Sequence, residues 1–95
     1  MARAIVAYAY GVTLEDMYGT TRGDPRTACA RQVAMYLSRV VFRMTLCEVA
    51  AAFMRAPSTV CHATQHIEDM RDDPEFDRTL QYLETALRTA AGDAA

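Results

Sequence analysis

The sequence TLCEVAAAF at residues 45–53, followed after a short turn by PSTVCHATQHI at residues 57–67, decides the fold. Thr45 and Glu48 form a full capping box, which predicts that a helix begins at this point. Ala50 is the small residue that two helices need where they cross most closely. Two short helices joined by a tight turn at this spacing are typical of a helix-turn-helix.

The second helix of this pair has an apolar face and a polar face. Its apolar residues recur at intervals of three and four, which predicts that they pack against the preceding helix. They are Val60, Ala63, Ile67 and Met70. The side chains left facing outward are Ser58, Thr59, His62, Gln65 and His66. Uncharged donors and acceptors of this kind read base edges, so the pattern favours DNA binding over an ordinary helical hairpin with a polar exterior.

Helix-start signals also divide the rest of the chain. Asp24-Pro25 and Asp73-Pro74 each place an N-capping carboxylate before a proline, which suits the first helical position. The first pair predicts a long helix that ends near Arg43, and the second pair predicts a C-terminal helix. Two shorter helices are expected near the start of the chain, at about residues 2–10 and 13–18.

These signals, without any sustained strand alternation, predict an all-α fold, a small helical bundle that contains the helix-turn-helix. A chain of 95 residues has room for one domain of ordinary size and none for a separate catalytic domain. We predict a single domain at residues 1–91 and a frayed tail at residues 92–95.

The two longest helices each carry an apolar stripe. In the helix after Pro25 the predicted core positions are Cys29, Val33, Tyr36, Leu37, Val40, Val41 and Met44. In the C-terminal helix they are Phe76, Leu80, Leu83 and Leu87. A second, exposed and basic stripe on the long helix comprises Arg31, Arg39 and Arg43, with Gln32 beside them.

Charge is unevenly distributed along the chain, although the formal net charge is only −2. Residues 22–55 hold six arginines and two carboxylates, a net charge of +4. Residues 66–95 hold three arginines and eight carboxylates, a net charge of −5. One part of the chain is therefore suited to meeting phosphate, while another repels it.

Neither metal binding nor catalysis is expected. Three cysteines at irregular spacing argue against a disulfide framework, and we expect buried, reduced thiols. Cys47, Cys61, His62 and His66 form an alternative zinc set, but no Cys-x-x-Cys pair exists and the spacing is unusual. Adjacent helical residues point about 100° apart, so Cys61 and His62 do not suit a nucleophile and base. We predict no metal, no cofactor and no enzyme.

The chain has no predicted membrane segment. Unbroken apolar runs such as residues 49–54 are far too short to cross a bilayer, and residues 1–12 lack the pattern of a secretory signal. We expect no membrane partner and a cytoplasmic, nucleoid-associated location.

Several of these residues match a known family. The stretch Ala30-Arg-Gln-Val-Ala-Met35, together with Ser58-Thr-Val60 and His62-Ala63, resembles the C-terminal DNA-binding domain of the bacterial replication initiator DnaA. Val6-Ala7 and the residues that follow them resemble that domain's leading segment, so the resemblance covers nearly the whole chain. It implies the same small helical fold, with double-stranded DNA as partner.

The resemblance also implies roles for individual residues. Arg31 and Gln32 correspond to DNA backbone contacts, and Leu46 and Cys47 bring helix-start amides to a phosphate. Arg22 and Arg26 lie near the loop from which the family inserts an arginine into the minor groove. The full candidate set is Arg22, Arg26, Arg31, Gln32, Arg43, Thr45, Leu46, Cys47, Arg55, Ser58, Thr59, His62, Gln65 and His66.

The sequence departs from the family at the start of the recognition helix. The family signature Gly-Gly-Arg-Asp-His-Thr-Thr-Val is replaced by MRAPSTV at residues 54–60, one residue shorter and without Asp and His. Ser58 and Thr59 remain as readers of the DnaA box. No glycine-rich phosphate loop is present, so we expect no nucleotide binding and no initiator activity by this chain alone.

Two classes of function stay open on the sequence. The first is a stand-alone DNA-binding regulator that acts at replication origins or promoters, on sites related to the DnaA box. The second is a protein-interaction module that pairs with a second copy or another protein and has lost DNA binding. The basic stripe favours the first, because phosphate contacts dominate affinity. The missing Asp-His pair and the negative net charge favour the second.

Overall fold

The computed structural model describes residues 25–92, which form four α-helices and no strand. The helices are α3 (Pro25–Val40), α4 (Leu46–Phe53), α5 (Pro57–Met70) and α6 (Pro74–Gly92). The predicted all-α fold is therefore confirmed. Within this part of the chain, no helix combines the length and the apolar content of a membrane span. The two helices expected before residue 20, Arg22, the side chain of Arg26 and residues 93–95 lie outside the described residues.

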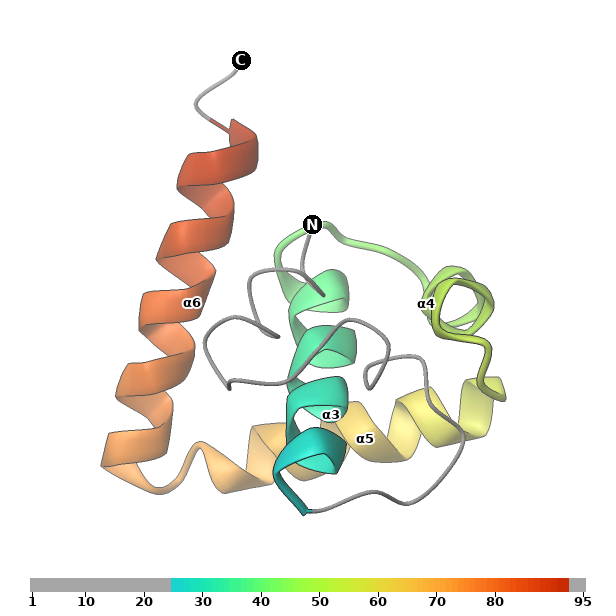
Figure 1. Cartoon of the computed structure of the whole chain (residues 1–95), viewed down its shortest axis with the longest axis horizontal. Helices are drawn as coiled ribbons and strands as arrows, with labels where there is room; N and C mark the ends of the chain where they lie inside the picture. The colour runs from blue at the N-terminus through green and yellow to red at the C-terminus, as the bar shows by residue number, and fades with distance from the viewer. Residues whose placement is uncertain (1–24, 93–95) are drawn as a thin grey trace.

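Helix α3 is the centre of the arrangement (Figure 1). Helix α5 crosses it, α4 lies beside the start of α5, and α6 lies on the opposite side of α3 from α4. The apolar residues that these helices bury form one cluster. Its largest fully buried side chains are Met35, Leu37, Phe53, Ile67, Leu80 and Leu87.

The central position of α3 explains why its predicted apolar stripe is only partly right. Every residue from 33 to 38 is buried, including Ser38, whose hydroxyl donates to the Ala34 carbonyl at 2.8 Å. Val40, which we expected in the core, is instead 39% exposed. A helix surrounded by neighbours buries several faces along its middle, so a single stripe underestimates its core.

Helix α3 also ends earlier than predicted, which moves Arg43 off the basic stripe. The last helical residue is Val40, and Arg43 has a positive φ of 56°. The Met44 amide donates to the Ser38 carbonyl at 3.3 Å across this turn. Because the left-handed residue redirects the chain, Arg43 does not continue the spacing of Arg31 and Arg39, and that part of the prediction is wrong.

The capping box that starts α4 is confirmed. The Thr45 hydroxyl accepts from the Glu48 amide at 3.1 Å, and the Glu48 carboxylate accepts from the Thr45 amide at 2.8 Å. At its other end α4 stops at Met54, which has a φ of 55°. The Met54 amide donates to Ala51 and the Arg55 amide donates to Ala50 at 2.9 Å. These two bonds form a Schellman cap, in which glycine is the usual left-handed residue.

Met54→Gly is expected to stabilise the fold by about 1 kcal/mol, since a side chain at positive φ costs roughly 1–2 kcal/mol and added chain entropy offsets part of the gain. The midpoint of thermal unfolding should rise by about 4–8 °C. Ala51→Gly, at an exposed position inside α4, is the control and should destabilise by about 1 kcal/mol. A fall in the midpoint for Met54→Gly would contradict the cap assignment.

The start of α6 is capped by Asp73, as predicted, since the Asp73 carboxylate accepts from the Glu75 amide at 3.3 Å. Between α5 and α6 the side chain of Arg71 forms ion pairs with Asp77 and with Glu84, the latter at 2.9 Å. Arg71 also donates to the hydroxyl of Tyr36 on α3 at 3.1 Å. One guanidinium therefore links α3, the α5–α6 turn and α6.

The pKa values of Arg71 and Tyr36 reflect these contacts. Burial alone would lower the pKa of Arg71, but its hydrogen bonds with Glu84, Asp77 and Tyr36 outweigh burial and raise it. Burial and the hydrogen bond to Glu68 raise the pKa of Tyr36, against the lowering effect of Arg71. Tyr36 therefore keeps its proton and donates it to the Glu68 carboxylate, at 2.6 Å.

Candidate nucleic-acid interface

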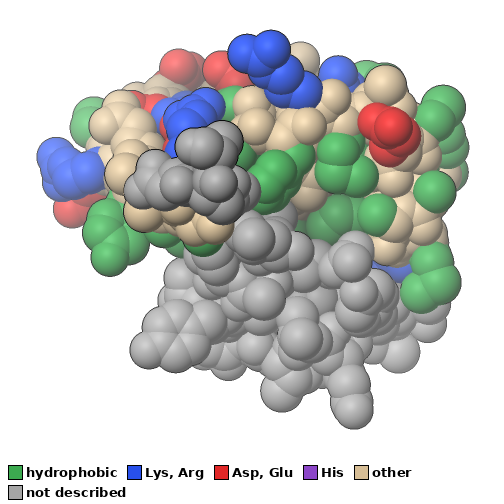
Figure 2. Space-filling model, turned by 90° about the horizontal axis from the view of Figure 1, so that it is seen from above, with side chains coloured by type: hydrophobic (Ala, Val, Ile, Leu, Met, Phe, Trp, Pro, Cys, Tyr) green, Lys and Arg blue, Asp and Glu red, His purple; other side chains and the backbone are tan. Residues whose placement is uncertain are grey.

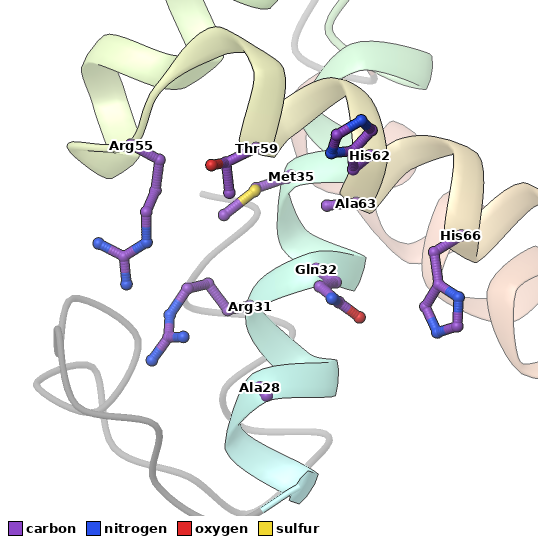
Figure 3. Close-up of a pocket in the computed structure, with 9 residues that line it drawn as sticks. All are labelled: Ala28, Arg31, Gln32, Met35, Arg55, Thr59, His62, Ala63 and His66. Atoms are coloured by element: carbon purple, nitrogen blue, oxygen red, sulfur yellow. The ribbon is translucent and has the colours of Figure 1, made fainter.

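A hollow of about 430 Å³ lies between α3 and α5. Its lining comes from α3, from the turn before α5 and from α5 itself (Figure 3). The lining residues are Ala28, Arg31, Gln32, Met35, Arg55, Thr59, His62, Ala63 and His66. Six of the predicted site residues are thus brought together in one place, although they come from three separate stretches of sequence.

The floor of the hollow is apolar. Met35 and Ala63 are buried in the contact between α3 and α5. Ala28 precedes Met35 by two helical turns and lines the same hollow. We did not predict these residues as part of the site. The signal was present, because Ala28, Arg31 and Met35 follow the helical spacing of one face.

The polar rim is set by the helical repeat of α5 and by the turn before it. Thr59, His62 and His66 recur at three and four residues, so they share one side of α5. Arg55 extends from the turn toward the side of the hollow on which Arg31 of α3 lies (Figure 3). Its guanidinium donates to the Met54 carbonyl at 3.3 Å, which ties this side chain to the turn.

The hollow contains cations but no carboxylate among its described lining residues. Elsewhere the two signs mix: arginine and acidic side chains are interspersed over the face seen in Figure 2. Because the lining combines two arginines with uncharged donors, the hollow is suited to an anionic group.

Gln65 and Arg39 lie at a different hollow, of about 300 Å³, with Tyr36, Val40, Thr64 and Glu68. Gln65 donates to the Asp69 carboxylate at 3.1 Å. The single basic stripe predicted for α3 is therefore divided, since Arg31 and Arg39 line separate hollows that both border α5. The interval of eight positions from Arg31 to Arg39 explains the separation, because it turns 80° around a helix beyond two full turns.

The remaining described candidates do not line the first hollow. Four of them are exposed, and Leu46 is half-buried against the core. The exposed ones are Arg43, Thr45, Cys47 and Ser58. Helix α5 begins at Pro57 after Ala56, which provides no side-chain cap, so the start of α5 differs from the capped start of α4.

The prediction of buried thiols is wrong for two of the three cysteines. Cys47 and Cys61 are exposed and Cys29 is half-buried, and none of the three forms a disulfide. Cys61 directly follows the buried Val60, and one residue is enough to turn a helical side chain away from the core. Within the described residues, no three His, Cys, Asp or Glu side chains are placed to hold a metal ion, so the alternative zinc set does not assemble there.

The family model of the bacterial dnaA protein helix-turn-helix matches residues 3–67, more than half of the chain. The chain belongs to this family. The resemblance predicted from residues 30–35 and 58–63 is therefore confirmed. Because the matched part includes α3, α4 and most of α5, the dnaA helix-turn-helix contains the hollow and its rim.

Individual DnaA proteins agree with the family assignment. The chromosomal replication initiator protein DnaA of Aquifex aeolicus (strain VF5) is 40% identical over an alignment of 81 residues, which covers 83% of this chain and 20% of that protein. A crystal structure of a DNA replication initiation factor has a TM-score of 0.82 at 36% identity, over 90% of this chain and 26% of that one.

A replication initiator DnaA bound to AMPPCP and single-stranded DNA has a TM-score of 0.77 at 33% identity, over 90% of this chain and 28% of that chain. The chain therefore spans only 20–28% of the length of these relatives. The helix-turn-helix bundle is the part that they share with it.

Proposed function

We propose that this chain binds double-stranded DNA through its helix-turn-helix and has no catalytic role. The observation that carries the proposal is the hollow between α3 and α5, where Arg31 and Arg55 meet uncharged donors and no described carboxylate. Phosphate contacts supply most of the affinity of DNA-binding proteins, and cations on adjoining elements suit a DNA backbone.

The two sides of this surface have different tasks in the proposal. Arg31, Gln32 and Arg55 hold the backbone and fix the position of the protein on the duplex. The exposed side of α5 enters the major groove, where Ser58 and Thr59 meet base edges. The amides at the start of α4 add a phosphate contact, which the dipole of that helix favours.

The proposal also includes a biological setting, which we infer from the family. The relatives are replication initiators, and one of them is bound to single-stranded DNA. The choice of duplex for this chain is supported by the helix-turn-helix, whose second helix fits a major groove. We infer a regulatory role at replication origins or promoters, on sites related to the DnaA box.

A salt series tests the function most directly. Binding is measured by fluorescence anisotropy on a random duplex and on one that contains the DnaA box. We expect both to bind, with log affinity falling linearly against log salt. Preference for the box should be weak, since each missing base contact of the Asp-His pair removes about 1–3 kcal/mol of discrimination.

Two results would count against this proposal. Strong discrimination for the DnaA box would contradict the proposed loss of base contacts at the start of α5. Failure of both duplexes to bind at low salt would reject DNA binding altogether. In that second case, a dimer in sedimentation velocity would support the alternative of a protein-interaction module.

A further inference from the structure

The chain contains two histidines, and both line the hollow between α3 and α5. His62 and His66 are exposed and stand on successive turns of α5. An imidazole gains a proton and a positive charge as the pH falls through the near-neutral range. The hollow therefore carries the only two side chains of this type in the molecule, next to the two arginines of its rim.

Within the part of the chain that the structure describes, few charged groups surround these histidines. Helix α3 contributes Arg31, and the turn before α5 contributes Arg55. On α5 itself the carboxylates nearest in sequence are hydrogen-bonded: Glu68 accepts from the hydroxyl of Tyr36, and Asp69 accepts from the side-chain amide of Gln65. On α4 the Glu48 carboxylate is part of the capping box, and the Cys47 thiol is exposed.

We propose that DNA binding in this hollow is coupled to proton uptake by His62 and His66, so that the affinity for DNA rises as the pH falls from about 8 to about 6. The inference rests on the proposed DNA-binding function and adds a means of regulation at the same site. The chemistry that it requires is a phosphate group, which a protonated imidazole binds as both a charge and a hydrogen-bond donor.

The physical reason is that the proton and the phosphate bind at the same site, so each changes the affinity for the other. A nearby negative charge favours the charged form of an ionisable group. Phosphate in the hollow therefore favours protonated imidazole, and a lower pH must favour phosphate by the same factor. Each protonated histidine also displaces cations from the DNA, so the salt dependence of binding becomes steeper at lower pH.

The test is the dissociation constant for a random duplex at about pH 6 and about pH 8, at equal ionic strength. We expect about tenfold tighter binding at the lower pH, the effect of one to two added phosphate contacts. The slope of log affinity against log salt should be steeper by about one to two units. Circular dichroism at both pH values checks that the fold is unchanged.

His62→Gln with His66→Gln removes both imidazoles and keeps polar side chains at two exposed positions. The ratio of the two dissociation constants should fall from about ten to about one. Each single substitution should remove part of the ratio. Arg78→Gln, at an exposed site on α6, changes the net charge by one unit and should leave the ratio at the wild-type value.

The outcomes separate this inference from the function on which it rests. Equal affinity of the wild-type chain at both pH values, with salt-dependent binding intact, overturns the proton coupling alone. A double variant that keeps the full ratio overturns it as well, because the proton would then bind elsewhere. Loss of DNA binding by the wild-type chain at every pH rejects the proposed function itself.

Discussion

Replacing Arg31 and Arg55 together by alanine should weaken the binding of duplex DNA by about 50-fold at physiological salt. The two guanidiniums line the same hollow from two different elements. A charge-assisted hydrogen bond to phosphate contributes on the order of 1–1.5 kcal/mol, so two of them account for a factor of this size. The salt slope should decrease by about two units, as expected for two lost backbone contacts.

The loss should be about equal for random and box-containing DNA, because backbone contacts carry no base information. Arg78→Ala with Arg88→Ala is the matched control, since both residues are exposed on α6 and the change in net charge is the same. We expect the control pair to weaken binding only slightly. An equal loss in the control would mean that net charge, and not the hollow, determines affinity. A loss confined to one DNA sequence would contradict the backbone role.

The helix boundaries show which parts of the fold are local and hence readable from sequence. The capping box at Thr45 and the Asp73-Pro74 pair mark helix starts where the sequence predicts them. These signals act within four residues, because a side chain binds an amide on the next turn. The end of α3 carries no such marker. Arg43 adopts a left-handed conformation without a glycine, so the predicted helix was too long.

The sequence predicts which residues belong to the site better than it predicts which of them lie together. Arg31, Thr59 and His62 were identified from helical spacing and family resemblance, and they share one hollow. Gln65 was placed with them, yet it lies with Arg39 on another surface. Spacing places a residue on a face of its own helix, but the crossing of α3 and α5 decides which faces meet. That crossing depends on side chains from both helices at once.

The role of Arg71 is not predictable from the sequence, because it depends on contacts with residues far away in the chain. Its partners Tyr36 and Glu84 lie 35 and 13 residues away. The sequence indicates an excess of acidic residues after residue 66, which suggests a solvated surface. The structure instead uses Asp77 and Glu84 to hold Arg71. Long-range pairs of this kind carry no periodic pattern, so sequence reasoning had no means of finding them.

The contacts of Arg71 also affect where α6 lies with respect to the proposed DNA surface. No residue of α6 lines either hollow that borders α5 among the described residues. Arg71 and Tyr36 attach the start of α6 to the side of α3 opposite α4 (Figure 1). Negative charge on α6 is thus held away from the surface that we propose meets phosphate, which reduces repulsion between them.

Arg71→Met should destabilise the fold by about 3 kcal/mol, because breaking a buried ion pair leaves uncompensated charges. The side chains of Arg71 and Glu84 are only 15% and 12% exposed. Asp77 is 31% exposed and therefore screened, which keeps the expected loss at the lower end of the range for buried pairs. The midpoint of thermal unfolding should fall by about 12–24 °C.

Two further variants determine whether the effect comes from the ion pairs. Arg71→Met combined with Glu84→Gln removes one of the stranded charges and should recover a large part of the loss, as a double-mutant cycle would measure. Arg78→Met replaces an exposed arginine on α6 and should change stability by less than about 0.5 kcal/mol. At temperatures well below its unfolding midpoint, the Arg71→Met variant should have an affinity for DNA within about twofold of the wild-type value, because Arg71 does not line the hollow. An Arg71→Met variant as stable as wild type would show that the contacts of Arg71 contribute little to the fold. A folded variant that has lost DNA binding would place α6 in the interface.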